Sequence, residues 1–192
     1  MMMKLVFLTT FAILAGLAHC DDPEVPGTLI DYSQCNYIYG NAGDWLRCQN
    51  GYVGIGACGS QTSRNCNAYI AQIECCKMAQ GEMQTSCEDY VGVNGESMTC
   101  PGTLAVYGIC GTAGTGQCEG RTTGIECCES ELPVSGSDCY WDYFCNGQYG
   151  RCRDNYVMQG RCGSLNFAEC PANDDYGSTT HGIRCCPLNR LV

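Results

Sequence analysis

The chain has 192 residues, of which 20 are Cys and 25 are Gly, and it carries 10 Lys and Arg residues against 20 Asp and Glu residues. Cysteine this frequent is typical of a scaffold held by disulfide bonds rather than by a large apolar core alone. The formal net charge of −10 is opposite to the charge that a phosphate backbone attracts, so we expect no nucleic-acid partner.

The first residues have the form of a secretory signal peptide. A basic start, Met1–Lys4, is followed by the apolar run Leu5–Ala18 and then by acidic sequence. This run is shorter than the roughly 20 apolar residues that cross a bilayer, and no second run of that length follows. We therefore expect residues 1–20 to be a signal peptide, cut after Ala18 or after Cys20. The mature chain should be secreted and extracellular, without a transmembrane segment.

After an acidic N-terminal segment at residues 21–34, the cysteines repeat in three tandem copies, at residues 35–76, 87–128 and 139–186. Copies one and two both read C-x12-C-x9-C-x7-C-x8-C-C, and copy three lengthens only the fourth spacing, from eight residues to fourteen. Repetition in register indicates that each copy is one structural unit. The cysteines of the copies are Cys35, Cys48, Cys58, Cys66, Cys75 and Cys76, then Cys87, Cys100, Cys110, Cys118, Cys127 and Cys128, then Cys139, Cys152, Cys162, Cys170, Cys185 and Cys186.

Each copy carries two short segments that are typical of β-strands. One is an aliphatic and aromatic segment that leads into Gly-x-Cys-Gly, and the other ends in Ile-x-Cys-Cys. Glycine turns bound these segments, and no stretch has a sustained apolar period of 3.6 residues. We therefore predict a small disulfide-rich, mainly β fold of three tandem six-cysteine modules with little helix.

Copies of this length are too small to fold on hydrophobic burial alone, so we expect three disulfide bridges within each copy. Six cysteines allow fifteen connectivities, and we exclude those that bond the two adjacent cysteines to each other. The adjacent pair should then join the end of each copy to two different places in that copy. Short polar linkers favour self-contained modules, arranged as beads on a string or as a compact stack.

Two cysteines stand outside the repeated pattern, Cys20 and Cys145. If the signal peptide is cut after Ala18, these two could pair, and the twenty cysteines would make ten bridges; this is the hypothesis that we favour. If it is cut after Cys20, Cys145 is left odd. An odd thiol in a secreted protein suggests a disulfide-linked dimer, and a free thiol without a role is the remaining alternative.

No group of residues has the pattern of a catalytic or metal site. The insertion Asn173–Thr180 of copy three offers oxygen ligands for a weakly held Ca²⁺, but its spacing is not that of an EF-hand, so we interpret it as a solvated loop. His181 has no candidate nucleophile or partner and should be a surface residue. No Gly-x-Ser-x-Gly or C-x-x-C element occurs. We therefore expect no enzyme activity, no catalytic or metal-binding residues and no cofactor.

The twelve tyrosines are candidate contact residues for sugars or solid surfaces, Tyr52 and Tyr156 above all. The alternative is that these rings fill the small cores of the copies. The closing Cys-Cys of each copy resembles the dicysteine repeats of galaxin-type skeletal matrix proteins. The spacing between the cysteines is different, so this resemblance carries over no site residue.

The sequence predicts a secreted, non-enzymatic structural protein of an extracellular matrix, coat, shell or adhesive. It would act by multivalent association with matrix components, a polysaccharide or a mineral surface, and the acidic copy two would favour a mineral. The alternative is a soluble multivalent carbohydrate-binding (lectin-like) or defence protein. A matrix protein should resist extraction without reductant, whereas a lectin should be released by a sugar.

Overall fold

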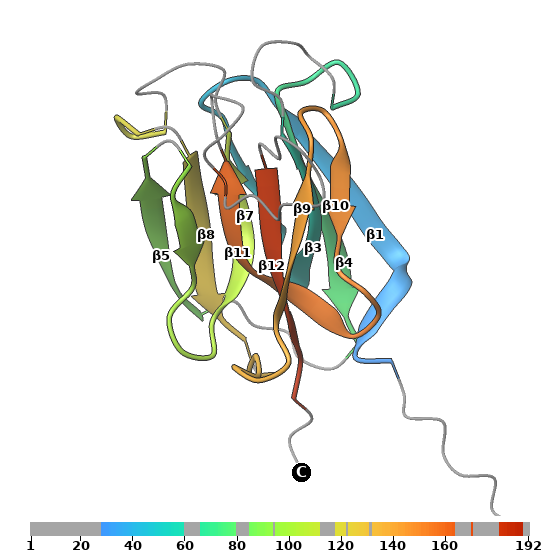
Figure 1. Cartoon of the computed structure of the whole chain (residues 1–192). Helices are drawn as coiled ribbons and strands as arrows, with labels where there is room; N and C mark the ends of the chain where they lie inside the picture. The colour runs from blue at the N-terminus through green and yellow to red at the C-terminus, as the bar shows by residue number, and fades with distance from the viewer. Residues whose placement is uncertain are drawn as a thin grey trace, which may run out of the picture.

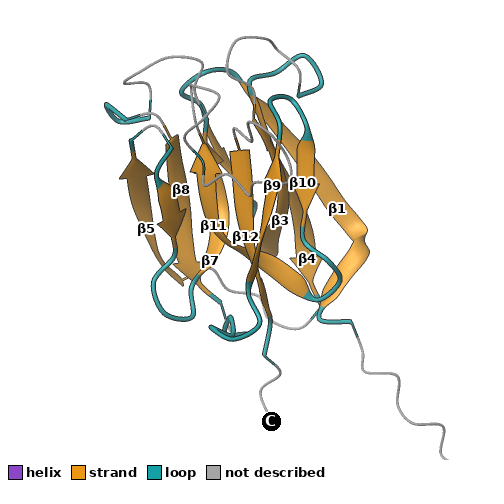
Figure 2. Ribbon diagram, viewed as in Figure 1, coloured by secondary structure: helices purple, strands orange, loops and turns teal. Residues whose placement is uncertain are grey.

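A computed structural model of the chain describes residues 28–59, 66–79, 85–93, 95–111, 118–121, 123–130, 132–163, 170 and 181–189. In these residues there are twelve β-strands and no helix (Figure 2). The prediction of a small disulfide-rich, mainly β fold is therefore confirmed. The described residues include no helix long and apolar enough to cross a membrane.

Each copy supplies four strands in the same order, and the second strand of each copy is only three residues long. The segments predicted to be strands are the third and fourth strands of each copy. Copy one forms β1 (Ile30–Gly40), β2 (Trp45–Arg47), β3 (Tyr52–Gly59) and β4 (Ala71–Met78). Copy two forms β5 (Thr85–Gly92), β6 (Ser97–Thr99), β7 (Ala105–Cys110) and β8 (Thr123–Glu129). Copy three forms β9 (Tyr140–Phe144), β10 (Tyr149–Arg151), β11 (Tyr156–Gly163) and β12 (His181–Pro187).

The strands form three four-stranded sheets, and each sheet takes its fourth strand from another copy. The first sheet has the order β1-β4-β3-β10, the second β5-β8-β7-β2 and the third β9-β12-β11-β6. The short strands pair antiparallel with the third strand of the copy that receives them: β2 with β7, β6 with β11 and β10 with β3. Copy one thus gives a strand to copy two, copy two to copy three, and copy three back to copy one. The exchange is a closed cycle.

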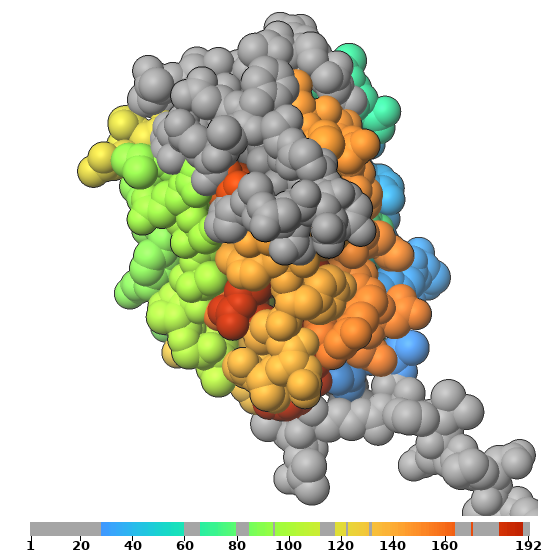
Figure 3. Space-filling model, viewed as in Figure 1, coloured from blue at the N-terminus to red at the C-terminus, as the bar shows by residue number. Residues whose placement is uncertain are grey.

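The three copies share one apolar core. The third strands β3, β7 and β11 all contact one another, and the buried residues of the three sheets belong to a single cluster. Its centre repeats with the sequence: Val53, Ala105, Val157, Ile73, Ile125 and Ile183 are all fully buried. The coloured segments of the three copies also meet directly on the face shown in Figure 3, and β5 and β1 lie at opposite sides of the same body (Figure 1). This corrects the expectation of self-contained modules, because each copy needs its neighbours to complete a sheet.

Nine disulfide bridges join the cysteines of the copies, each within one copy. The first cysteine bonds the sixth, the second bonds the fifth and the third bonds the fourth. The bridges are Cys35–Cys76, Cys48–Cys75, Cys58–Cys66, Cys87–Cys128, Cys100–Cys127, Cys110–Cys118, Cys139–Cys186, Cys152–Cys185 and Cys162–Cys170. The adjacent cysteines therefore do reach two different places in their copy.

The bridge between the second and fifth cysteines crosses from one sheet to the next. Cys48 follows β2 directly, and β2 lies in the second sheet, whereas its partner Cys75 lies in β4 of the first sheet. The backbone N–H of Cys48 donates to the carbonyl oxygen of Tyr107 in copy two, at 2.7 Å. A bridge that stays within one copy therefore fastens that copy to its neighbour.

We predict that removing this bridge will loosen copy two as well as copy one. In a Cys48→Ala/Cys75→Ala variant, loss of the bridge should lower the free energy of unfolding by roughly 3–4 kcal/mol, as expected for a closed loop of about 27 residues. Hydrogen exchange should become faster in β2 and also in its partner β7. The control is Cys58→Ala/Cys66→Ala, which opens a loop of only 8 residues within one copy. Faster exchange confined to copy one in the first variant would contradict the exchange of strands.

Candidate binding surface

The two tyrosines predicted as contact residues lie at the beginnings of equivalent strands. Tyr52 begins β3 and Tyr156 begins β11, and both are half-buried against the core cluster. The ring of Tyr156 also packs against Tyr140, with a centroid distance of 5.6 Å, and against the guanidinium of Arg153, at 4.0 Å. Both rings pack against the core and stay partly exposed, so their role as contact residues remains a prediction.

Of the two unmatched cysteines and the insertion of copy three, the structure describes only Cys145. Cys145 is exposed and unbonded in the turn between β9 and β10. Cys20 and the insertion Asn173–Thr180 lie outside the described residues. A bridge between Cys20 and Cys145, or a dimer through Cys145, therefore stays a prediction.

A cluster of tyrosines lies on the outer surface of the first sheet. Tyr37, Tyr69 and Tyr149 are among the most exposed large hydrophobic residues of the described chain. The rings follow one another in contact: Tyr149 to Tyr37 at 6.1 Å between centroids, Tyr37 to Tyr39 at 6.4 Å, and Tyr39 to Tyr69 at 5.2 Å. Sequence reasoning missed this cluster.

The fold explains why these rings meet. Tyr37 and Tyr39 are two residues apart in β1, so their side chains point to the same side of the sheet. Tyr149 reaches them from copy three, because β10 is the strand that copy three gives to the first sheet. Gly56 of β3 lies beneath Tyr149, where an added Cβ would collide with its hydroxyl. The spacing of two residues between Tyr37 and Tyr39 could have indicated that their rings share one face of a strand. Nothing in the sequence indicated that Tyr149 would join them.

A buried ion pair lies beside the tyrosine cluster. Glu74 is 3 % exposed; it accepts a hydrogen bond from the hydroxyl of Tyr149 and pairs with Nε of Arg151 at 3.0 Å. Burial and the hydrogen bond to Glu74 raise the pKa of Tyr149, so this hydroxyl stays protonated and donates. The negative charge of Glu74 is therefore balanced within the protein.

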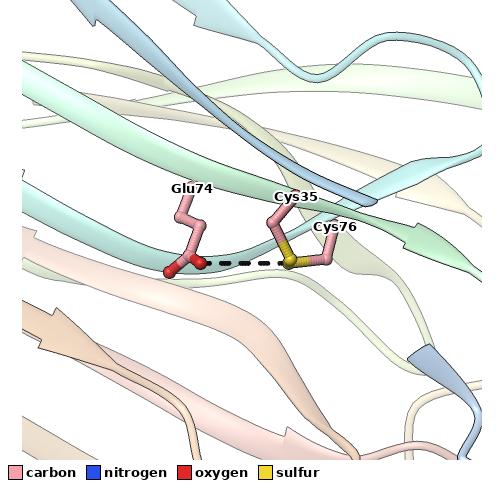
Figure 4. A group of neighbouring side chains, drawn as sticks. All are labelled: Cys35, Glu74 and Cys76. Carbon is pink, nitrogen blue, oxygen red and sulfur yellow. Dashed lines mark hydrogen bonds between the residues drawn. A yellow bond between two sulfur atoms is a disulfide. The ribbon is translucent and has the colours of Figure 1, made fainter. Parts of the chain in front are cut away.

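Glu74 also lies next to the bridge between Cys35 and Cys76, which gives a group of three side chains of metal-ligating type (Figure 4). Oε1 of Glu74 lies 4.0 Å from Sγ of Cys76. Both sulfur atoms are bonded to each other, so neither is the thiolate that binds a metal ion. In the oxidised protein this group is a carboxylate beside a disulfide, not a metal site.

The tyrosine cluster borders a groove, which we call the tyrosine groove. It has a volume of about 400 Å³ and is lined by Tyr37, Tyr39, Cys58, Cys66, Asn67, Gln72, Gly147 and Tyr149. Nδ2 of Asn67 donates to the hydroxyl of Tyr39 at 3.0 Å. The lining side chains are aromatic rings, amides and a disulfide, and none of them is charged. Such a groove has the means to bind a ligand by stacking and hydrogen bonding.

The equivalent surfaces of the other two sheets differ. On the third sheet, the positions of Tyr37 and Tyr39 are taken by Trp141 and Tyr143, whose partly exposed rings stack at 5.5 Å. On the second sheet they are taken by Asp89 and Val91. Two of the three outer surfaces therefore carry neighbouring rings in contact, whereas on the second sheet Trp45 of β2 packs over Gly124 and against the guanidinium of Arg47.

The acidic second sheet is partly neutralised by the strand that it receives. Arg47 of β2 pairs with Asp89 at 3.0 Å and with Glu126 at 2.7 Å. Two of the acidic residues that would favour a mineral surface, Asp89 and Glu126, are thus already engaged by a cation from copy one.

His181 is buried, contrary to the expectation that it lies on the surface. It is 5 % exposed, and both of its ring nitrogens lack a hydrogen-bond partner among the residues that the structure describes. The ring stacks on Phe144 at 6.0 Å and packs so closely on Gly59 that a Cβ there would lie 2.6 Å from Nδ1. Gly59 belongs to copy one, so this burial site exists only where the copies meet. The sequence around His181 contains no pattern that predicts this burial.

Comparison with known proteins gives no relative. No protein-family model matches the chain, and no curated protein sequence and no solved structure matches it either.

We predict that His181 makes the protein less stable in acid. Burial, and then the nearby charge of Arg161, lower the pKa of His181 from its ordinary 6.5 to about 3. Between these values the unfolded chain binds a proton that the folded chain does not, so the free energy of unfolding falls as the pH falls through this window. The contribution reaches about 1.4 kcal/mol per pH unit.

The test is urea unfolding of the wild type and of His181→Thr at pH 7, 6, 5 and 4. Threonine is the residue at the same position of copy two, Thr123, and it does not titrate. The difference in stability between the two proteins should shift in favour of the variant as the pH falls. A difference that is independent of pH would contradict the prediction.

Proposed function

We propose that the protein is secreted and non-enzymatic, and that it binds a polysaccharide surface in an extracellular matrix, coat, shell or adhesive. The observation that carries the proposal is the pair of aromatic surfaces at equivalent positions of the first and third sheets, around Tyr37 and Trp141. Exposed rings offer stacking area to sugars, and they are costly to leave in water without a partner.

The rigidity of the body supports this role. Nine bridges and one shared core hold both aromatic surfaces on the same unit. When one surface has bound a repetitive material, the other is held close to further copies of the same ligand, which raises the overall affinity. A chain with so many bridges also resists unfolding and digestion outside the cell.

Secretion is supported by the form of residues 1–20 and by the disulfides, which persist in oxidising compartments. Association with a mineral has less support, because Asp89 and Glu126 are already paired with Arg47. A soluble lectin is the second candidate, and the tyrosine groove favours it. The two candidates differ in whether binding needs both aromatic surfaces or the groove alone.

The test is retention of the full mature chain on particles of cellulose, chitin and calcium carbonate. The variants are Tyr37→Ala, Trp141→Ala and the two together; the control is Val93→Ala, which shortens a side chain that is 49 % exposed but not aromatic. We expect each single change to weaken retention on polysaccharide roughly threefold to tenfold, as for the loss of one stacking contact.

The double variant should lose more than either single variant, and Val93→Ala should behave as the wild type. Retention on calcium carbonate alone would contradict the proposal and support a mineral role. If only Tyr37→Ala matters and soluble sugar elutes the protein, the lectin is the better description.

A further inference from the structure

The geometry points to the tyrosine groove as a binding site for an uncharged glycan, a chain of neutral hexose or N-acetylhexosamine units. This inference rests on the proposed function and adds to it the place of binding and the class of sugar. The groove lies on the first sheet and is made by two copies, because Tyr149 and Gly147 come from copy three.

The aromatic part of the groove suits a chain rather than a single sugar. Tyr149, Tyr37 and Tyr39 follow one another at centroid distances of 6.1 Å and 6.4 Å. Each ring presents a flat apolar surface of about the size of a pyranose, whose C–H groups pack on it. Tyr37 and Tyr39 are inclined by only 33°, so these two rings can contact successive sugars, whereas Tyr149 stands at 71° to Tyr37 and borders the chain with its edge.

The polar part of the groove has an amide that is left for a ligand. Gln72 is only 8 % exposed, lines the groove, and makes no side-chain hydrogen bond to the described part of the chain. The amide faces the groove, and sugar hydroxyl groups both donate to and accept from an amide. The same position holds Gly124 in copy two and Gly182 in copy three, so the amide belongs to this groove alone.

The uncharged lining of the groove favours some classes of sugar over others. Among the described residues, no lining side chain is charged, and Glu74 nearby is balanced by Arg151 at 3.0 Å. A sulfated or uronic-acid glycan needs cationic side chains to offset its desolvation. The groove offers such a ligand none, so a neutral chain is favoured.

The walls of the groove are held in place before a ligand arrives. The bridge between Cys58 and Cys66 fixes the turn that carries Asn67. On the other side, the backbone N–H of Gly147 donates to the carbonyl oxygen of Gly59 at 2.8 Å. Binding would therefore order little of the protein, which limits its entropic cost.

The experiment is a calorimetric titration of the full mature chain with soluble hexasaccharides: cellohexaose and chitohexaose as neutral chains, and heparin and alginate oligomers as charged ones. We expect binding of at least one neutral chain and none of the charged chains. Gln72→Leu keeps the size of the side chain and removes its hydrogen bonds; it should weaken binding about threefold to tenfold. Tyr37→Asp, which installs the residue of copy two, should weaken it at least as much.

Val93→Ala is the control, because it shortens an exposed side chain that does not line the groove and should leave hexasaccharide binding unchanged. Melting temperatures of all variants show whether any loss is due to unfolding. Binding of the charged chains only, or an equal loss in Val93→Ala, would overturn the inference. If no neutral hexasaccharide binds but particles of cellulose or chitin still retain the wild type, the groove assignment is wrong and the proposed surface binding stands.

Discussion

The pairing of β10 with β3 is the contact on which the rest of the structure depends, because it closes the cycle of exchanged strands. A copy of this size buries too little apolar surface to be stable alone. By exchanging strands, three copies complete three sheets and place Val53, Val106 and Val157 in one common core. The bridge from Cys48 to Cys75 and its equivalents hold the exchanged strands covalently. Hydrophobic burial and disulfide bonding thus stabilise the same assembly and not separate parts of it.

Close approach of the exchanged strand explains the glycine that recurs two residues before the third cysteine. At Gly56 an added Cβ would meet Tyr149 of β10. At Gly160 it would meet the backbone oxygen of Met98 in β6. Both contacts come from the strand that another copy provides. The glycine is therefore required by the neighbour, because it allows the short strand to pair closely beside the third strand of the copy that receives it.

Much of each copy could be predicted from the sequence. The segments before Gly-x-Cys-Gly and Ile-x-Cys-Cys are strands, because their apolar and β-branched residues bury on both sides of a sheet. The exchange could not be predicted, since a strand of three residues such as Trp45–Arg47 has no periodicity of its own. The burial of His181 and the approach of Tyr149 to Tyr37 were missed for the same reason. Each depends on contacts between copies, and cysteine spacing within a copy carries no information about them.

The closed cycle also fixes how many copies the fold needs. In a chain of two such copies, the third strand β3 would lack its partner β10; a fourth copy would find the third strands β3, β7 and β11 already paired with the short strands of other copies. Open edges invite pairing with other molecules and aggregation. Duplication of this unit in evolution would therefore have been selected in threes, with two-copy intermediates confined to oligomers that complete the cycle between chains.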